Sequence, residues 1–480
     1  MTASPAIVES TATELSRAIH ARELSCVELL DACYAQIDRL NPQVNALVAF
    51  ADRDAMRQQA RGLDGLLARG ESLGSMHGFP QAPKDIAPAA GMVTTRGSPI
   101  FAGQVTQTDA VAFERMRAGG SLFIARSNSP EFGLGGHTYN PVYGTTRNAF
   151  DPALSAGGSS GGAAVAVALS MLPVADGSDM MGSLRTPAAF NNIYGLRTSV
   201  GCVPHGPGDE VFFQQFSVTG PMARNIPDLA LLLSVQAGFD ARLPLTRRGE
   251  GRRDWGAALE RDWHGARIGW LGDLGGHLPM EPGVLETCRA ALAHFSSMGC
   301  TVEEVLPRFD MESLWRAWID LRSFSIAGAN AALYQNPAKR ALLKPEMLFE
   351  MERGQALSAM QLYGAAQVRS AWYEALRRLF ESHDFLVLPA AQVFPFDARQ
   401  HWPDAVGGRA MDSYHRWMQA VVPATMAGLP ALAAPAGFGP QGLPAGLQIM
   451  GPAQADLAVL QIGHAYDQAS DHARVRSPLL

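Results

Sequence analysis

Two serine-rich turns framed by glycine carry the strongest chemical signal in this chain. They are residues 157–162, Gly-Gly-Ser-Ser-Gly-Gly, and residues 181–187, Met-Gly-Ser-Leu-Arg-Thr-Pro. Glycine lets the backbone approach a reacting group closely and adopt dihedral angles that a side chain forbids. A serine hydroxyl is a poor nucleophile at neutral pH and needs a neighbouring base to accept its proton. The turns therefore predict nucleophilic chemistry with a base supplied from another part of the chain.

Lys84, in the segment Pro83-Lys84-Asp85, is the candidate for that base. No histidine is fixed beside either turn by the sequence, although one of the twelve could arrive from elsewhere in the fold. Burial disfavours the charged ammonium and lowers the pKa of a lysine, which can then accept a proton. The neighbours Gln81, Ala82 and Ile86 are consistent with partial burial.

Residues 157–161 also match GxSxG, the nucleophile elbow of α/β-hydrolases, which would make Ser159 the nucleophile of an esterase. That elbow follows a buried strand, and residues 151–156, Asp-Pro-Ala-Leu-Ser-Ala, do not have a strand pattern. A phosphate-binding loop is a further alternative, but the Lys-Ser/Thr that ends a P-loop is absent.

Composition excludes several classes of protein. The 480 residues are 47% apolar and 18% charged, as in a compact soluble protein with one or two domains. The formal net charge of -6 gives no basic surface for a nucleic-acid partner. Five scattered cysteines without a CxxC pair favour reduced thiols, and no histidine spacing matches a metal site, so we expect no metal and no cofactor. The N-terminus lacks a signal-peptide pattern and no long apolar run occurs, which predicts a cytoplasmic protein without a membrane partner.

Helices and short apolar strands alternate along much of the chain. Ser25 and Glu28 form a capping-box pattern that opens a helix ending near residues 41–42. Helical spacing covers residues 108–118, and the Ala-, Val- and Gly-rich residues 160–171 predict a buried helix. Strands are expected at 122–125, 172–175, 268–271, 302–305, 385–388, 432–434 and 446–450. This alternation predicts an α/β fold with a mixed, mostly parallel sheet covered by helices.

Residues 306–430 depart from this alternation because they are mainly helical and rich in aromatic side chains. We expect this segment to cap a substrate pocket, the alternative being that its aromatics belong to the core or to ordinary surface. The aromatics concerned are Trp315, Trp318, Phe324, Tyr334, Trp372, Tyr373, Trp402, Tyr414 and Trp417.

Taken in order, these motifs resemble the amidase signature family. Ser159 and Ser183 are 183 − 159 = 24 residues apart, as the family places its two serine turns. Other landmarks follow in family order: Lys84-Asp85, Thr108-Asp109-Ala110, Asn128 through Glu131-Phe132, Gly195-Leu196-Arg197, Thr219 to Arg224, Gly428 to Ala431 and Gly442 to Gln448. The resemblance covers essentially the whole chain. It implies one amidase domain over 1–480, with N-terminal helices in 1–75, a catalytic core in 76–230, an α/β continuation in 231–305, a helical cap in 306–430 and C-terminal strands and a helix in 431–480.

The resemblance also implies a catalytic mechanism for hydrolysis of a carbon–nitrogen amide-type bond. Ser183 would attack the carbonyl, Ser159, preceded by a cis peptide, would relay its proton, and neutral Lys84 would be the base. Backbone N–H groups of Met180, Met181, Gly182 and Ser183 would hold the oxyanion. Ser160, Asp179 and Arg185 would support these loops.

This chain departs from the family at Met180-Met181, where a glycine usually precedes Gly182. Methionine is flexible and can mould to a bulky group, so the pair either lines the pocket or packs inward. We expect an aryl amide, a carbamate (urethane) or an ester as substrate, with Met180, Met181, Phe132, Phe212 and Phe213 in the pocket. The expected partner is this small molecule, and the chain is expected to be a monomer or homodimer. The alternative is an amidotransferase A-type subunit that acts only inside a complex.

Overall fold

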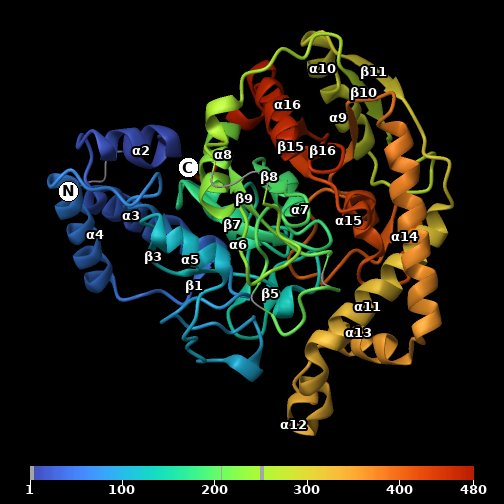
Figure 1. Cartoon of the computed structure of the whole chain (residues 1–480), viewed down its shortest axis with the longest axis horizontal. Helices are drawn as coiled ribbons and strands as arrows, with labels where there is room; N and C mark the ends of the chain where they lie inside the picture. The colour runs from blue at the N-terminus through green and yellow to red at the C-terminus, as the bar shows by residue number, and fades with distance from the viewer. Residues whose placement is uncertain (1–4, 207, 214, 249–252) are drawn as a thin grey trace.

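The computed structural model describes residues 5–206, 208–213, 215–248 and 253–480. Within these residues the centre is one eight-stranded sheet in the order β11-β10-β12-β16-β15-β8-β9-β7 (Figure 1). Its strands are β7 (Val174–Asp179), β8 (Tyr194–Arg197), β9 (Val218–Ala223), β10 (Arg267–Trp270), β11 (Thr301–Glu304), β12 (Phe385–Pro389), β15 (Ala431–Phe438) and β16 (Pro444–Met450). Each of the expected strands from residue 172 onward is present.

The sheet is mixed, as expected, but the expectation of mostly parallel pairing is wrong. Only β10 pairs in parallel, with β11 and β12, while the other five pairings in the described sheet are antiparallel. The strands β7 and β8 are joined along the chain by a helix and run in the same direction. In the sheet, however, β9 lies between them and is antiparallel to both. The strands β15 and β16 form a hairpin, which is antiparallel by construction.

Helices cover the sheet. The main ones around it are α6 (Gly161–Ala168), α7 (Arg185–Phe190), α8 (Ile226–Gln236), α9 (Val284–Ala291) and α16 (Asp456–Ala469). All of α6 is buried, which confirms the buried helix predicted after the first serine turn. The backbone at the start of α7 lies very close to β8, since a Cβ added at Gly195 would be 2.5 Å from the carbonyl oxygen of Leu184. Glycine at 195 therefore lets the second serine turn sit directly on the sheet.

The N-terminal part forms a group of helices at one side of the molecule, coloured blue to cyan in Figure 1. It contains α2 (Ala12–His20), α3 (Cys26–Val44), α4 (Arg53–Ala68) and α5 (Val111–Ala118). Of this group, α2 and α5 pack against α8. The predicted capping box at Ser25 and Glu28 is confirmed, and α3 continues through Pro42 to Val44 before Asn45 ends it at φ 51°. The predicted strand at 122–125 is the two-residue β3, which pairs with β2 outside the main sheet. Short elements here are α1 (Pro5–Glu9), β1 (Leu47–Val48), β2 (Pro80–Gln81), β3 (Leu122–Phe123), β4 (Arg126–Ser127), β5 (Tyr139–Asn140) and β6 (Gly144–Thr145).

Residues 306–430 contribute the gold and orange helices, on the side of the molecule opposite the N-terminal group in Figure 1. They are α11 (Met311–Gln335), α12 (Pro337–Arg340), α13 (Pro345–Ala356), α14 (Ala359–Leu379) and α15 (Val422–Ala427). The long helix α11 packs against both α13 and α14. Trp318, Trp372 and Trp417 are fully buried there, so these aromatics belong to the core. Smaller elements are α10 (Ala293–Ser297), β13 (Ala405–Val406) and β14 (Arg409–Ala410).

All five cysteines are buried, and none is paired with another. Among the described helices, none is long and apolar enough to cross a membrane.

Candidate active site

Lys84 lies in the segment that follows β2 and is held beside β4 by a bridge to Ser127. Its carbonyl oxygen accepts a hydrogen bond from Arg126 Nη2 at 2.8 Å. The side chain is 1% exposed, and its Nζ lies 2.8 Å from Ser159 Oγ, 2.8 Å from Ser160 Oγ and 3.1 Å from Ser178 Oγ. The structure thus brings the sequence-predicted lysine against the first serine turn.

Burial lowers the pKa of Lys84 to about 7, against an ordinary value of 10.5, although the carboxylates of Asp176 and Asp179 act in the opposite direction. Asp176 lies in β7, and its Oδ2 accepts a long bond of 3.4 Å from the Lys84 backbone N–H. Burial raises the pKa of Asp176 to about 6. Its Oδ1 has no hydrogen-bond partner in the described part of the chain. At neutral pH, therefore, much of Lys84 is a neutral amine next to serine hydroxyls.

The first serine turn lies against this lysine, and the second serine turn lies against the first. Ser159 follows a cis peptide bond from Gly158 and lies just before α6, while Ser183 lies just before α7. The Ser160 N–H donates to the Ser183 carbonyl at 3.2 Å, which ties the turns together. Ser159 and Ser183 line the same pocket, so a reacting carbonyl bound there would meet both hydroxyls.

This pocket has a volume of about 110 Å³, smaller than the usual site for a drug-sized ligand. Of the expected pocket residues, Phe132, Met180 and Met181 line it. Phe212 and Phe213 do not, because they lie on a surface loop with 63% and 72% exposure, and we remove them from the pocket. The remaining lining residues are Ile86, Gly133, Leu134, Gly135, Ser178, Ser217, Arg322, Ile326 and Met418. The segment 306–430 therefore reaches the pocket through Arg322, Ile326 and Met418 rather than through its aromatics.

Asp179 anchors the turn that carries Ser183. Its buried carboxylate lies 3.0 Å from Arg185 Nη2 and 3.3 Å from Arg197 Nη1. Burial alone would raise the pKa of Asp179, but the two guanidinium groups hold it below its ordinary value. Arg185 continues the network to Gln448 Oε1 at 2.7 Å, in β16. These contacts tie the turn that carries Ser183 to the sheet, which fits the supporting part expected for Asp179 and Arg185.

The four backbone N–H groups expected to hold an oxyanion do not all point into the pocket. The Gly182 N–H donates to Asp179 Oδ1 at 2.9 Å, so it is already used within the turn. For the N–H groups of Met180, Met181 and Ser183 we find no acceptor among the described residues. These three remain available to a developing oxyanion, and Gly182 is a structural donor instead.

The unusual methionine pair both lines the pocket and packs against α11. Trp318 Nε1 lies 3.4 Å from Met181 Sδ, and Arg322 Nη1 lies 3.5 Å from Met180 Sδ. Residue 181 does not have a positive φ, so the backbone does not require glycine there. Gly182 has φ 80°, and a Cβ at that position would be 2.7 Å from Val421 Cγ2. The glycine that the turn needs is the one that the chain retains.

Three residues at the site received no function from the sequence. Ser178 and Asp176 lie two residues apart in β7, and the period of two in a strand could have placed both beside Lys84. Arg322 follows Trp318 and precedes Ile326 at intervals of four in α11, so it falls on a buried apolar stripe. A charged residue is rarely buried without a partner, so an arginine on an apolar stripe could have marked Arg322 as a candidate site residue.

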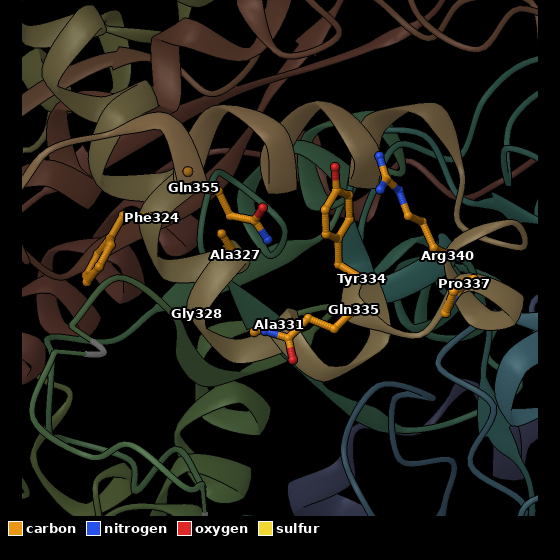
Figure 2. Close-up of a pocket in the computed structure, with 10 residues that line it drawn as sticks. Phe324, Ala327, Gly328, Ala331, Tyr334, Gln335, Pro337, Arg340 and Gln355 are labelled. Carbon is orange, nitrogen blue, oxygen red and sulfur yellow. The ribbon is translucent and has the colours of Figure 1, made fainter.

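A second, larger hollow of about 580 Å³ lies among α11, α12 and α13 (Figure 2). Figure 2 shows Phe324, Tyr334, Arg340 and Gln355 around it, and the Arg340 guanidinium lies 4.0 Å from the centre of the Tyr334 ring. This hollow is lined by none of the residues Lys84, Ser159, Asp179 and Ser183. We therefore assign the chemistry to the smaller pocket.

The nucleophile elbow expected for an α/β-hydrolase is absent from the described structure. Residues 151–156 form turns and isolated bridges, not a strand that delivers Ser159. The partner of Ser159 Oγ is a lysine, not a histidine.

Comparison with known proteins identifies a family for this chain. The Amidase family model matches residues 28–460. The chain is 33% identical to an acylamidase of Rhodococcus erythropolis, covering 94% of this chain and 93% of that protein. It is also 33% identical to the A subunit of the glutamyl-tRNA(Gln) amidotransferase of Symbiobacterium thermophilum, covering 98% of both. The crystal structure of a bacterial aryl acylamidase of the amidase signature family superposes with a TM-score of 0.90 at 28% identity, covering 97% of this chain and 98% of that one.

The family model over most of the chain and the likeness to these amide-hydrolysing relatives identify the class of protein. The chain belongs to the amidase signature family, and its reaction class is cleavage of carbon–nitrogen amide bonds.

Proposed function

We propose that this protein hydrolyses acyl amides of aromatic amines through an acyl-enzyme on Ser183. The observation that carries the proposal is the buried Lys84 Nζ, 2.8 Å from Ser159 Oγ in a pocket that Ser183 also lines. The similarity to an acylamidase and to an aryl acylamidase supports the choice of substrate. The pocket volume of about 110 Å³ supports a short acyl group.

In the proposed reaction, Ser183 Oγ attacks the carbonyl carbon and forms the new C–O bond. Its proton passes to Ser159 Oγ, which gives its own proton to neutral Lys84 Nζ. Collapse of the tetrahedral intermediate breaks the C–N bond while the same relay, run backwards, protonates the departing amine nitrogen. Water then attacks the acyl-serine ester and releases the carboxylic acid. Each backbone donor on the oxyanion contributes on the order of 3 kcal/mol, and we assign the donors among the N–H groups of Met180, Met181 and Ser183.

Turnover and acyl-trapping experiments test these assignments. The panel contains 4-nitroanilide amides, primary amides, carbamates and esters, each assayed with wild type and with Ser183→Ala, Ser159→Ala and Lys84→Ala. We expect a loss of at least about a thousandfold for Ser183→Ala, by analogy with removal of one member of a serine triad. Mass spectrometry of protein quenched during ester turnover should find the acyl group on Ser183.

Ser160→Ala is the matched control, because Ser160 Oγ is as close to Lys84 Nζ as Ser159 Oγ is but does not line the pocket. We expect a much smaller loss in this variant than in Ser159→Ala. An acyl group found on Ser159, or full activity of Ser183→Ala, would contradict the mechanism.

A second candidate function is that of an amidotransferase A-type subunit, favoured by the 33% identity to such a subunit over nearly its full length. Such a chain would depend on partner proteins. Turnover of 4-nitroanilides by the purified chain alone, at a rate unchanged by other proteins, would exclude this candidate. Turnover of glutamine alone among the panel would favour it.

A further inference from the structure

Among the described residues that line the pocket, Arg322 alone carries a permanent charge. It comes from α11, which is remote in sequence from both serine turns, and it is 3% exposed. A buried guanidinium needs an ion-pair partner and hydrogen-bond acceptors. How its donors are used therefore decides what it can offer a substrate.

Two of the three guanidinium nitrogens have oxygen acceptors outside the pocket lining. Its Nε donates to Glu350 Oε1 at 2.7 Å and its Nη2 donates to Tyr414 Oη at 3.0 Å. Tyr414 Oη in turn donates to Glu350 Oε1 at 2.6 Å, and Ser323 Oγ donates to Glu350 Oε2 at 2.6 Å. This network fixes the orientation of Arg322 from α13 and from the segment that precedes α15.

The third side, Nη1, has a weak partner. It donates to Met180 Sδ at 3.5 Å, and a thioether sulfur is a poor hydrogen-bond acceptor. Met180 also lines the pocket and lies three residues before Ser183. The fixed guanidinium thus presents N–H groups toward the space in which the substrate of Ser183 would bind.

Charge balance indicates what kind of oxygen would accept from Nη1. Burial alone would raise the pKa of Glu350, but Arg322 holds it below its ordinary value, so Glu350 is ionised. The Arg322–Glu350 pair is therefore neutral overall, and a substrate carboxylate would bring an unpaired negative charge into the pocket. An uncharged oxygen would gain the hydrogen bond without that penalty.

We propose that Arg322 is a specificity-determining residue whose Nη1 donates to an uncharged ether or carbonyl oxygen of the substrate, separate from the scissile carbonyl. This inference rests on the proposed amide hydrolysis at Ser183. It adds that the preferred substrate carries a second oxygen on its acyl or amine part.

Two pairs of substrates of matched shape test it. On the acyl side, the 3-methoxypropionyl and pentanoyl 4-nitroanilides differ by an ether oxygen in place of a methylene. On the amine side, acetyl 4-methoxyanilide is compared with acetyl 4-ethylanilide. For each pair the ratio of kcat/KM values is measured in wild type and in variants, so that differences in intrinsic reactivity cancel between the proteins.

Arg322→Lys keeps a cation for Glu350 but loses the planar fork that serves three partners. In case this variant does not fold, the double variant Arg322→Gln/Glu350→Gln removes both charges together. Tyr414→Phe is the control, because it removes a partner of Nη2 and leaves Nη1 unchanged. We expect the oxygen preference in at least one pair to fall about tenfold or more in the Arg322 variants and to persist in Tyr414→Phe.

Unchanged ratios in both pairs would overturn the inference, as would an equal loss of kcat on all four substrates, which would indicate a general structural effect. A wild-type preference for succinyl over pentanoyl 4-nitroanilide that disappears in Arg322→Lys would also overturn it in favour of carboxylate recognition. Failure of the proposed function would look different, because wild type would then turn over none of these amides.

Discussion

Asp176 gives the sharpest test of the idea that Lys84 acts as a neutral base. Its carboxyl group is buried in β7, accepts a hydrogen bond from the Lys84 backbone N–H and is among the charges that favour the protonated amine. Replacing Asp176 with Asn keeps the shape and an acceptor oxygen but removes the negative charge. The pKa of Lys84 should then fall below about 7.

The size of the effect follows from the titration of one amine. An ordinary lysine of pKa 10.5 would be neutral in only about one molecule in 3,000 at pH 7, whereas a pKa of about 7 makes about half of the molecules active. Loss of a nearby opposite charge lowers a pKa by on the order of one unit. At pH 6 the neutral fraction would then rise from about one tenth to at most about one half, because Asp176 has its own pKa of about 6 and is already partly protonated at that pH. The variant should therefore retain up to about fivefold more of its maximal activity.

The assay is kcat/KM for a 4-nitroanilide between pH 5 and 9, since this parameter reports the titration of the free enzyme. The substrate does not ionise in this range. Wild type should show an acidic limb with a midpoint near pH 7, and Asp176→Asn should move the midpoint downward. Glu281→Gln is the matched control, because Glu281 is also partly buried but is not among the charges acting on Lys84.

An unchanged or raised midpoint in Asp176→Asn would refute the reasoning, provided that the variant folds and the control behaves like wild type. So would a wild-type profile that is flat across this range, because no group with the pKa expected for Lys84 would then control the reaction.

Three further outcomes follow from burial and charge. The folded state lowers the pKa of Lys84, so between about pH 7 and 10.5 the unfolded chain holds a proton that the folded chain lacks, and the stability from this group rises with pH across that window. Urea unfolding should show this rise in wild type and its loss in Lys84→Met. Equal slopes of unfolding free energy against pH in the two proteins would contradict the argument. Asp179→Asn leaves the buried Arg185 and Arg197 without their carboxylate and should cost about 3–5 kcal/mol of unfolding free energy; a loss under about 1 kcal/mol would show that the network is not important for stability. Phe213→Ala removes an exposed ring outside the pocket, so it should change kcat/KM by less than about twofold and the unfolding free energy by under about 0.5 kcal/mol. A large loss of kcat/KM on aryl amides would return this loop to the substrate site.

Local features of the fold could be predicted from the sequence because they depend on neighbouring residues. The capping box at Ser25 and the fully buried helix after Ser160 are of this kind. The direction of strand pairing is not local. The strands β8 and β9 contain glycine or proline and lack an apolar run, so composition does not mark them, yet β9 inserts between β7 and β8 and makes that part of the sheet antiparallel.

The candidate site also contains some residues that local motifs indicate and others that only tertiary packing brings to the site. Ser159 and Ser183 could be chosen from glycine-framed turns, and Lys84 from its apolar setting and the family resemblance. The structure places both serines at one pocket and the Lys84 amine against Ser159. Phe212 and Phe213 were chosen only for their aromatic character, and nothing local indicates whether a loop turns a ring inward or outward. Arg322 was missed because its importance depends on packing between α11 and a turn about 140 residues earlier.

The methionine pair shows how such a site can change its substrate without losing its backbone geometry. The positive φ and the close contact with Val421 restrict position 182 to glycine, whereas position 181 has neither constraint. Side chains at 180 and 181 are therefore free to vary, but each contacts one residue of α11, Arg322 and Trp318 respectively. Residues in contact are coupled, so we expect the effect of a smaller side chain at 181 to depend on the side chain at 318. We therefore expect substrate specificity to depend jointly on the turn that carries Ser183 and on α11.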